Sequence, residues 1–294
     1  LTTGTGSGKS LAYIIPIVNH ILKTGSGQGV KAIIIYPMNA LANSQFGELE
    51  KFLKNGFGSG PYPATFERYT GQQDQETRDR ILKNPPDILL TNYVMLELML
   101  TRPFEKKIIE SARNLEFLVL DELHTYLGRQ GADVTLLLRR VRELLGGKQL
   151  ICVGTSATIA SSGTWQQQRA RVAELATRLF GGQVADNCIV GETLKRCSPP
   201  LSESNPSDIS ALKKAIQQGD KRALNTFDEF IADPISRWLE GAVGIIPEEE
   251  SGRLIRSMPA SLTGASGIAS KLSRLTGLPI PDCERVIISS FLKG

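Results

Sequence analysis

The stretch Thr3-Gly4-Thr5-Gly6-Ser7-Gly8-Lys9-Ser10 decides the fold, because it has the composition of a phosphate-binding loop. Glycines let consecutive backbone N–H groups turn inward around a polyphosphate, a lysine reaches the β- and γ-phosphates, and a Ser or Thr hydroxyl binds Mg²⁺. The strict pattern has glycine where Thr3 stands, so the loop is a relaxed variant. Such a loop joins a strand to a helix, and only two residues precede it here. We therefore expect the chain to be a piece of a longer protein that supplies this strand.

Residues 1–180 alternate between short apolar runs and helical patterns. This alternation predicts an α/β fold, a parallel sheet with helices on both faces. The predicted strands are residues 32–36, 65–69, 88–91, 117–120 and 150–153. The predicted helices are residues 9–22, 41–53, 75–82, 93–98, 132–145 and 165–180.

The pattern changes near Cys197. We predict a first domain over 1–196, a polar Pro/Ser-rich linker over 197–207 and a mainly helical accessory domain over 208–294, without strands. Its last two helices, residues 268–275 and 281–292, leave two interpretations open. A helix-turn-helix or winged-helix unit would bring Lys271, Arg274 and Arg285 near DNA, whereas the favoured interpretation is a helical accessory domain.

Composition sets only broad limits. The 294 residues carry 34 basic and 30 acidic side chains, and the net charge of +4 is a weak indication of nucleic acid. No apolar run reaches the ~20 residues that span a bilayer. The four cysteines, at positions 152, 188, 197 and 283, form no C-x-x-C pair, which argues against a zinc site or a disulfide framework. We expect reduced thiols in a cytoplasmic protein.

Two carboxylates, Asp121 and Glu122, directly follow an apolar run over 117–120. In an open α/β sheet the carboxyl ends of the strands form the ligand-binding edge, which the phosphate-binding loop shares. We expect Asp121 to hold the metal of Mg·ATP and Glu122 to orient or deprotonate the attacking water. The alternative is a structural acid pair that caps the next helix, and the presence of Lys9 and Ser10 makes it unfavourable.

His124 completes the sequence Asp-Glu-Leu-His. A single histidine is usually a structural residue. Here Ser156 and Thr158, near the end of the next predicted strand, could hydrogen-bond it. Such a contact would transmit the nucleotide state to a second surface.

Three motifs together resemble motifs I, II and III of superfamily 2 helicases, in the order and spacing of the first RecA-like domain of the DEAD/DEAH type. They are residues 5–10, 121–124 and 154–158. Residues 36–42, 69–72 and 91–92 are similar to motifs Ia, Ib and Ic. Residues 121–134 and 138–140 look like one branch, which contains mitomycin repair factor A, fungal RecQ4-like DNA helicases and helicase subunits of antiphage systems such as DISARM. Members often carry a C-terminal cysteine cluster, which this sequence lacks.

The resemblance implies bound ATP and Mg²⁺. In this branch it favours DNA over RNA, and it suggests 3′→5′ movement without fixing a direction. The nucleotide would contact Thr5, Gly6, Ser7, Gly8, Lys9, Ser10 and Asp121, with Ser10 and Asp121 on the metal. Motifs Ia to Ic would grip one strand through its backbone without reading sequence. The residues expected there are Pro37, Asn39, Asn43, Thr70, Gly71, Thr91 and Asn92. The alternative is that they are ordinary turn residues at strand ends. Arg129 could equally contact DNA or solvate its loop.

The sequence thus predicts an ATP-dependent helicase or translocase motor that serves DNA repair or antiviral defence, with Lys9, Asp121 and Glu122 as catalytic residues. An RNA helicase and a nucleotide-responsive scaffold are the alternatives. Superfamily 2 motors take an arginine finger from a second RecA domain, and such a contact is worth about 10³–10⁵ in rate in related phosphoryl transfers. We therefore expect this segment alone to bind ATP weakly and hydrolyse it poorly.

Overall fold

The computed structural model describes residues 8–58, 62–156, 164–249 and 252–293. It divides the chain into two compact units, Leu1–Glu192 and Thr193–Gly294. Each unit has its own buried core. In the described part of the chain, no helix is both long and apolar enough to cross a bilayer.

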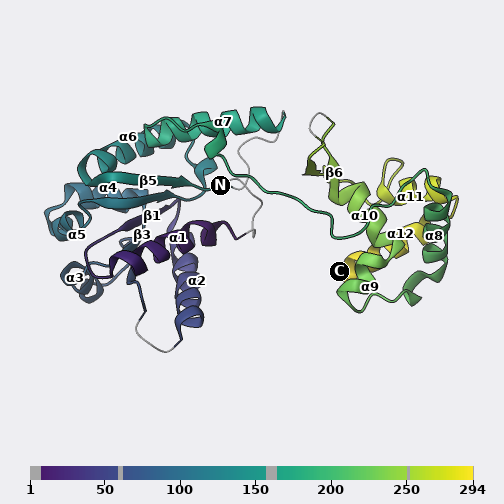
Figure 1. Ribbon diagram of the computed structural model, residues 1–294, viewed down its shortest axis with the longest axis horizontal. Coiled ribbons are helices and arrows are strands. Elements are labelled where there is room, and N and C mark those ends of the chain that lie inside the picture. Colours follow the sequence, from purple (N-terminus) through teal and green to yellow (C-terminus); the bar gives the residue numbers. More distant parts are fainter. Residues whose placement is uncertain (1–7, 59–61, 157–163, 250–251, 294) are drawn as a thin grey trace. The chain divides into compact units, whose positions relative to one another are not determined.

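The first unit is built on a sheet of five parallel strands in the order β2-β3-β1-β4-β5 (Figure 1). The strand β1 reads Ala-Ile-Ile-Ile-Tyr, and all five side chains are buried. A continuous apolar run of this kind is typical of a parallel strand covered on both faces, so the predicted fold class is confirmed. The strand bounds are β1 Ala32–Tyr36, β2 Phe66–Arg68, β3 Ile88–Asn92, β4 Leu115–Leu120 and β5 Gly146–Gly154.

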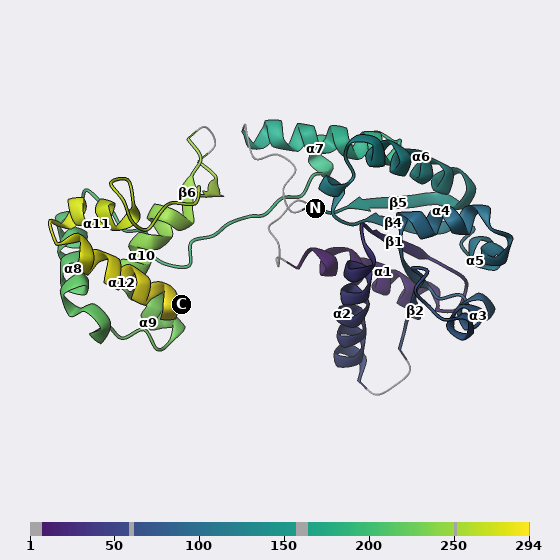
Figure 2. The same cartoon turned by 180° about the vertical axis from the view of Figure 1, so that it is seen from behind.

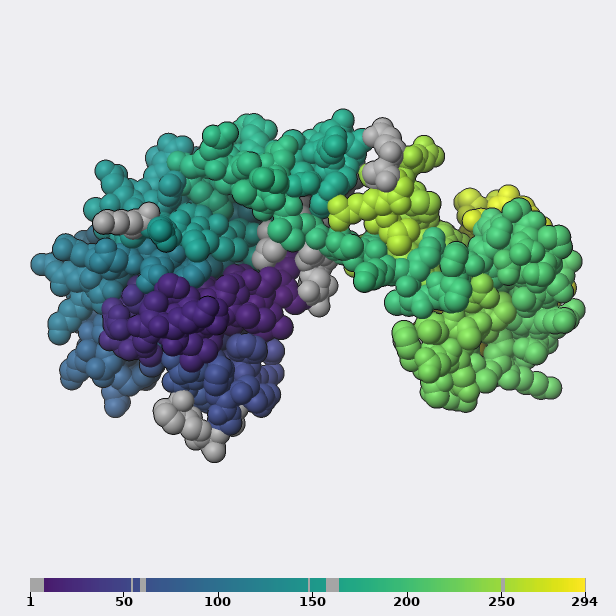
Figure 3. Space-filling view, viewed as in Figure 1, coloured from purple at the N-terminus to yellow at the C-terminus, as the bar shows by residue number. Residues whose placement is uncertain are grey.

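Helices cover both faces of this sheet (Figures 1 and 2). Ile33 and Ile35 of β1 pack in a cluster with α3 to α7, whereas Ala32 and Ile34 face the opposite way, toward α1 and α2. This division follows from the two-residue period of a strand. In the space-filling view, α1 (purple) and α2 (blue) lie next to each other (Figure 3). The bounds are α1 Lys9–Thr24, α2 Asn39–Phe57, α3 Gln75–Lys83, α4 Tyr93–Thr101, α5 Lys106–Ser111, α6 Gly128–Leu145 and α7 Trp165–Phe180, with short turns η1 Pro103–Glu105, η2 Leu123–Thr125 and η3 Asp186–Cys188.

The boundary between α6 and β5 differs from the sequence prediction, which starts the strand at residue 150. Gly146 ends α6 and begins β5 at once. A Cβ on Gly146 would lie 2.4 Å from the carbonyl O of Arg142, so only glycine allows so close a turn. Predicted helix ends elsewhere in the unit lie within a few residues of the observed ones.

The register of the strands brings the predicted motifs together. Tyr36 pairs with Asn92 at the end of β1 and β3, and Leu120 pairs with Gly154 at the end of β4 and β5. Because all five strands are parallel, the residues that follow them meet at one edge of the sheet. The loops after β1, β2, β3, β4 and β5 therefore share the edge where ligands bind in open α/β sheets.

The second unit is mainly helical, as predicted, but it also contains two strands. β6 Ile245–Pro247 and β7 Leu254–Arg256 form an antiparallel pair, so the expectation of no strands is wrong. The N–H of Glu248 donates to the carbonyl O of Arg253 and closes the pair, and Gly252 has a positive φ of 67° in the connecting turn. The helices are α8 Pro206–Gln218, α9 Phe227–Ala232, α10 Pro234–Leu239, α11 Ile268–Thr276 and α12 Ile280–Lys293, with η4 Gly219–Lys221 and η5 Glu240–Gly244.

The segment predicted as a linker packs on this second unit. The Glu240 carboxylate accepts hydrogen bonds from the backbone N–H groups of Cys197 (2.6 Å) and Ser198 (3.0 Å). The Arg237 guanidinium donates to the carbonyl O of Pro199 (3.0 Å). The Pro/Ser-rich composition of this stretch favours a linker, but residues about forty positions away hold it against the second unit. The second unit therefore begins at Thr193, before the predicted linker.

Candidate functional site

The N-terminus of α1 is arranged to receive an anion. Gly8 is its N-cap residue, with a left-handed φ of 74°, which glycine adopts without strain. No side chain caps this helix, and no acidic residue occupies its first turn. The positive end of the helix dipole therefore favours a phosphate at this point. Thr5, Gly6 and Ser7, which we expect to complete the loop, lie outside the described residues.

Asp121 follows β4 and is held by a neighbour that sequence reasoning left without a role. Thr155, which is fully buried, donates its hydroxyl to Oδ1 of Asp121 and accepts the backbone N–H of Glu122 at 3.1 Å. Burial raises the pKa of Asp121, and the charge of Glu122 adds to this, whereas the Thr155 hydrogen bond and the charge of Lys9 oppose it. Thr155 thus fixes both members of the acid pair.

Glu122 has a strained backbone, and two basic side chains contact its carboxylate. Its φ of 53° lies in the left-handed region, which is uncommon for a residue other than glycine and is concentrated at functional sites. Oε1 lies 3.9 Å from Nζ of Lys9, and Oε2 lies 3.3 Å from Nδ1 of His124. The same Nδ1 is 3.0 Å from Oγ of Ser156, so the contact expected between His124 and Ser156 is present. Thr158, the other expected partner, lies outside the described residues.

Two buried tyrosines support the base of this site. The hydroxyls of Tyr13 on α1 and Tyr36 on β1 are 3.3 Å apart, and Tyr13 also hydrogen-bonds Ser10. Burial raises the pKa of both tyrosines well above the usual value, and the charge of Asp121 acts in the same direction. Both hydroxyls therefore stay protonated, and Tyr13 holds the side chain of Ser10.

The N-terminus of α1 and the acid pair line a cleft of about 650 Å³, large enough for a nucleotide. The residues that carry chemistry in it are Gly8, Lys9, Ser10, Asp121 and Glu122, and α2 supplies the facing wall. A hydroxyl and a carboxylate are the hard oxygen ligands that Mg²⁺ accepts, so Ser10 and Asp121 fit the expected metal.

A second cavity, of about 520 Å³, lies at the same edge of the sheet, after β1, β2 and β3. Five residues predicted to grip nucleic acid line it: Pro37, Asn39, Thr70, Gly71 and Asn92. The motifs similar to Ia, Ib and Ic are therefore brought together around one hollow, although some of their residues, such as Asn39 and Asn92, lie 53 positions apart in the sequence.

The remaining predicted nucleic-acid residues lie elsewhere. Thr91 is fully buried and donates its hydroxyl to the carbonyl O of Tyr69 (2.7 Å), so its side chain has no surface to offer a strand. Asn43 is exposed on α2, where Oδ1 accepts a hydrogen bond from Arg68 (2.7 Å). Arg129 is exposed in the first turn of α6, and it does not line the second cavity.

The Asn92 side chain positions other groups. Its Oδ1 accepts the N–H of Met95 and caps α4 (2.7 Å), and its Nδ2 donates to Oδ1 of Asn39 (2.6 Å). Both ends of this amide are therefore engaged. The consequence is that Asn39 is oriented at the cavity, with its own amide nitrogen left to donate.

The comparisons with known proteins agree with this geometry. Residues 1–164, more than half of the chain, match the DEAD/DEAH box helicase family. The chain belongs to the DEAD/DEAH box helicase family.

Individual relatives share only part of their length with this helicase domain. Druantia protein DruE of Escherichia coli is 28% identical, with 55% of this chain and 15% of that protein covered. The uncharacterized ATP-dependent helicase YprA of Bacillus subtilis is 32% identical, with 54% and 20% covered. The crystal structure of the DUF1998 helicase MrfA bound to DNA is 26% identical, has a TM-score of 0.53, and is matched over 76% of this chain and 28% of that one. The chain spans less than a third of each.

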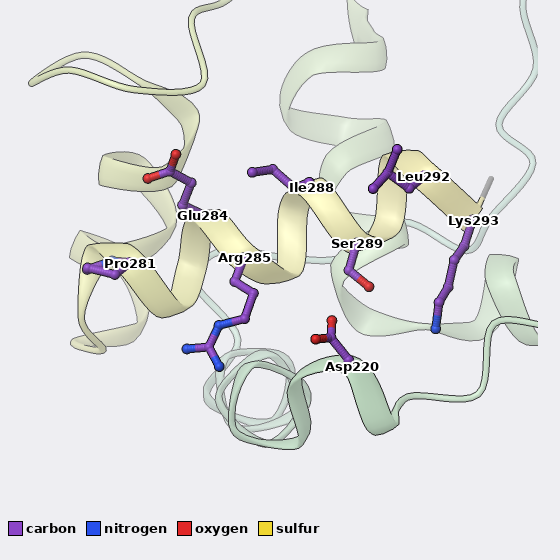
Figure 4. Close-up of a pocket in the computed structure, with 8 residues that line it drawn as sticks. All are labelled: Asp220, Pro281, Glu284, Arg285, Ile288, Ser289, Leu292 and Lys293. Atoms are coloured by element: carbon purple, nitrogen blue, oxygen red, sulfur yellow. The ribbon is translucent and has the colours of Figure 1, made fainter.

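The second unit lies outside the helicase match, and it has a cavity of its own. This hollow of about 490 Å³ runs along α12, whose residues Glu284, Ile288 and Leu292 lie on one side and Asp220 of η4 on another (Figure 4). Its lining mixes apolar groups with charges of both signs, and we assign no chemistry to it.

The three basic residues expected near DNA in a helix-turn-helix have partners within the second unit. Lys271 lies 2.9 Å from Glu203, Arg285 pairs with Asp282, and Arg274 donates to the carbonyl O of Ser270. These contacts support the accessory-domain interpretation over DNA binding by this unit.

Proposed function

We propose that this helicase domain hydrolyses ATP with Mg²⁺ to move along or unwind a nucleic-acid strand, with DNA as the favoured track. The observation that carries the proposal is the approach of Glu122 to Lys9 in a cleft at the same sheet edge as the cavity lined by the strand-gripping motifs. A pure nucleotide switch has no need of a carboxylate placed to activate water, so the scaffold alternative is disfavoured.

Each residue of the cleft has a distinct part in this proposal. Lys9 and the N-terminus of α1 bind the phosphates, and Ser10 and Asp121 would hold Mg²⁺. The metal, when bound, neutralises charge on the β- and γ-phosphates. Glu122 orients the water, and Thr155 keeps Glu122 and Asp121 in fixed relative positions through its shared hydroxyl. Phosphates that take over Lys9 would release Glu122 from its contact with that lysine.

The sheet supplies a path between the two cavities. Glu122 contacts His124, which contacts Ser156, while β1 pairs on one side with β4 and on the other with β3. A nucleotide state that shifts Glu122 therefore has contacts through which to change the affinity of the strand-end loops. Movement would follow from affinity differences between nucleotide states.

DNA is favoured because of the relatives. The solved structure of MrfA holds DNA, and over the matched part, 28% of that chain, it shares the fold and is 26% identical to this chain. The resemblance to repair helicases and antiphage helicase subunits supports a role in DNA repair or antiviral defence. Contacts to the backbone alone would make the binding independent of sequence.

The test uses the full-length protein and its Glu122→Gln variant in an ATPase assay with single-stranded DNA or matched RNA at one stated salt concentration. We expect DNA-stimulated hydrolysis that Glu122→Gln lowers at least a hundred-fold, about the size of a general-base effect. Glu116→Gln is the matched control, because Glu116 lies near the opposite end of β4 and pairs with Lys31 (3.0 Å). Turnover that survives Glu122→Gln would contradict the catalytic role, and stimulation by RNA alone would replace DNA with RNA.

A further inference from the structure

The cavity beside the strand-end loops contains more positive charge than its motifs predict. Two arginines, Arg78 and Arg102, line it together with polar and apolar residues, and none of the lining residues that the structure describes is acidic. Neither arginine belongs to the stretches that resemble motifs Ia, Ib and Ic. A concave surface with unbalanced positive charge attracts anions.

Arg78 is held in place by its own helix and by the turn before it. Asp74 caps α3 by accepting the N–H of Thr77 (2.8 Å), which fixes the start of the helix. Nη2 of Arg78 donates to the carbonyl O of Gly71 (2.8 Å), and Nε is buried without a hydrogen-bond partner among the described residues. Among the described residues Arg78 has no carboxylate within ion-pair distance. A buried donor of this kind is costly unless a ligand satisfies it.

Arg102 reaches the same cavity from another element. It is the C-cap residue of α4, and its N–H donates to the carbonyl O of Leu98 (2.9 Å). Pro103, the first residue of η1, restricts the backbone of the preceding Arg102 to the extended conformation that it adopts, with φ -91° and ψ 133°. The side chain is exposed, and no ion pair to it occurs within the described ranges. Its guanidinium is therefore available to a ligand.

The charges of the two guanidiniums act on the same buried residue, Tyr69. Burial and the charge of Glu105 raise the pKa of Tyr69 to about 12, and the charges of Arg78 and Arg102 both oppose this rise. Glu105 is itself almost fully buried and accepts the Tyr69 hydroxyl at 3.4 Å. Glu105 is not among the residues that line the cavity, and within the described residues it forms no ion pair with either arginine.

We propose that Arg78 and Arg102 together bind one phosphodiester of a single DNA strand, and we name this pair the two-arginine site. The guanidinium group donates paired, charge-assisted hydrogen bonds to phosphate oxygens, and two such groups on one phosphate supply both affinity and register. The Asn39 amide lies in the same lining and can donate to a neighbouring oxygen. The inference rests on the proposed function, because it requires a nucleic-acid strand in this cavity.

The experiment measures binding of a fluorescent oligo-dT by the full-length protein, over a series of salt concentrations, for Arg78→Gln, Arg102→Gln and the double variant. Arg80→Gln is the matched control: it makes the same charge change on the same helix, but Arg80 pairs with Glu67 and does not line the cavity. Thermal melting verifies that each variant is folded.

We expect each single variant to weaken binding about ten-fold, the effect of losing one hydrogen-bonded charge. The double variant should lower the slope of log affinity against log salt by about 0.7, the value for one phosphate contact on a single strand. The Arg80→Gln protein should bind like the wild type.

Three results would overturn the two-arginine site. The first is wild-type affinity in the double variant while the unaltered protein still binds oligo-dT, a result that leaves the proposed function standing. The second is a loss of affinity for inorganic phosphate with none for oligo-dT, which would assign the arginines to a small anion. The third is a loss seen with oligo-U and not with oligo-dT, which would assign them to RNA. Failure of the unaltered protein to bind any strand would instead contradict the proposed function.

Discussion

Thr155→Val removes one hydroxyl that serves two partners in the catalytic edge of the sheet. The hydroxyl donates to the Asp121 carboxylate and accepts the N–H of Glu122 at 3.1 Å, and Thr155 is completely buried. Valine has nearly the same shape, so the change leaves no large cavity and isolates the polar effect.

The magnitude follows from the two contacts. Loss of a hydrogen bond to a charged group costs about 1.5–3 kcal/mol, and a buried N–H left without an acceptor costs about 1–3 kcal/mol. We expect a loss of roughly 2–5 kcal/mol in the free energy of unfolding of the first unit, since the two effects overlap. ATP turnover by the full-length protein should fall as well, because the Glu122 backbone is no longer fixed.

Hydrogen–deuterium exchange with mass spectrometry is the suitable assay, because peptides from β4 and β5 report on the first unit separately from the second. Thr155→Ser, which keeps the hydroxyl and loses one methyl, is the matched control and should cost only about 1 kcal/mol. If exchange in Thr155→Val were as slow as in Thr155→Ser, the shared hydroxyl would not support the acid pair and the reasoning would be refuted.

Three further predictions concern groups outside the phosphate contacts. Arg222→Met should destabilise the second unit by about 3–5 kcal/mol in a urea titration, because it leaves Asp233 buried and unpaired, and an effect no larger than that of Lys221→Met would contradict this. Partial burial favours a higher pKa for Glu240, but hydrogen bonds from Ser198 and the N–H of Cys197 outweigh it and lower the pKa below the ordinary 4.5. The stability that Glu240 contributes is therefore complete above that value and is lost as the pH falls through the lowered pKa. In the Glu240→Gln variant, the urea concentration at the unfolding midpoint should therefore depend less on pH below about 5 than in the wild type. Parallel curves for the two proteins would argue against this role of Glu240. Tyr126→Phe should leave thermal stability unchanged or raise it, since the Tyr126 hydroxyl is buried without a hydrogen-bond partner in the described part of the chain. A clear fall in melting temperature would show that the hydroxyl has a partner.

Local patterns were sufficient to predict the sheet and the acid pair. β1 is apolar at every position because both of its faces are covered, and Asp121 and Glu122 directly follow such a run. Periodicity and strand-end position are properties of neighbouring residues, so the sequence displays them. The same reasoning located the start of α1 at Lys9.

Features that depend on distant partners were not accessible in this way. The role of Thr155 requires the register of β5 against β4, and the burial of Thr91 requires Tyr69 on the next strand. Arg78 could have been noticed, since it follows Gly71 by seven residues in a helix that Asp74 caps. No local signal marks Arg102, whose position depends on the end of α4.

The central claim is that Lys9 binds the phosphates and Glu122 activates the water. The most direct measurement is equilibrium binding of Mg·ATP, together with DNA-stimulated turnover, for full-length Lys9→Ala and Glu122→Gln. We predict that Glu122→Gln binds Mg·ATP about as tightly as the wild type and turns over at least a hundred-fold more slowly, whereas Lys9→Ala loses binding. Wild-type turnover in Glu122→Gln, or unchanged ATP affinity in Lys9→Ala, would contradict it.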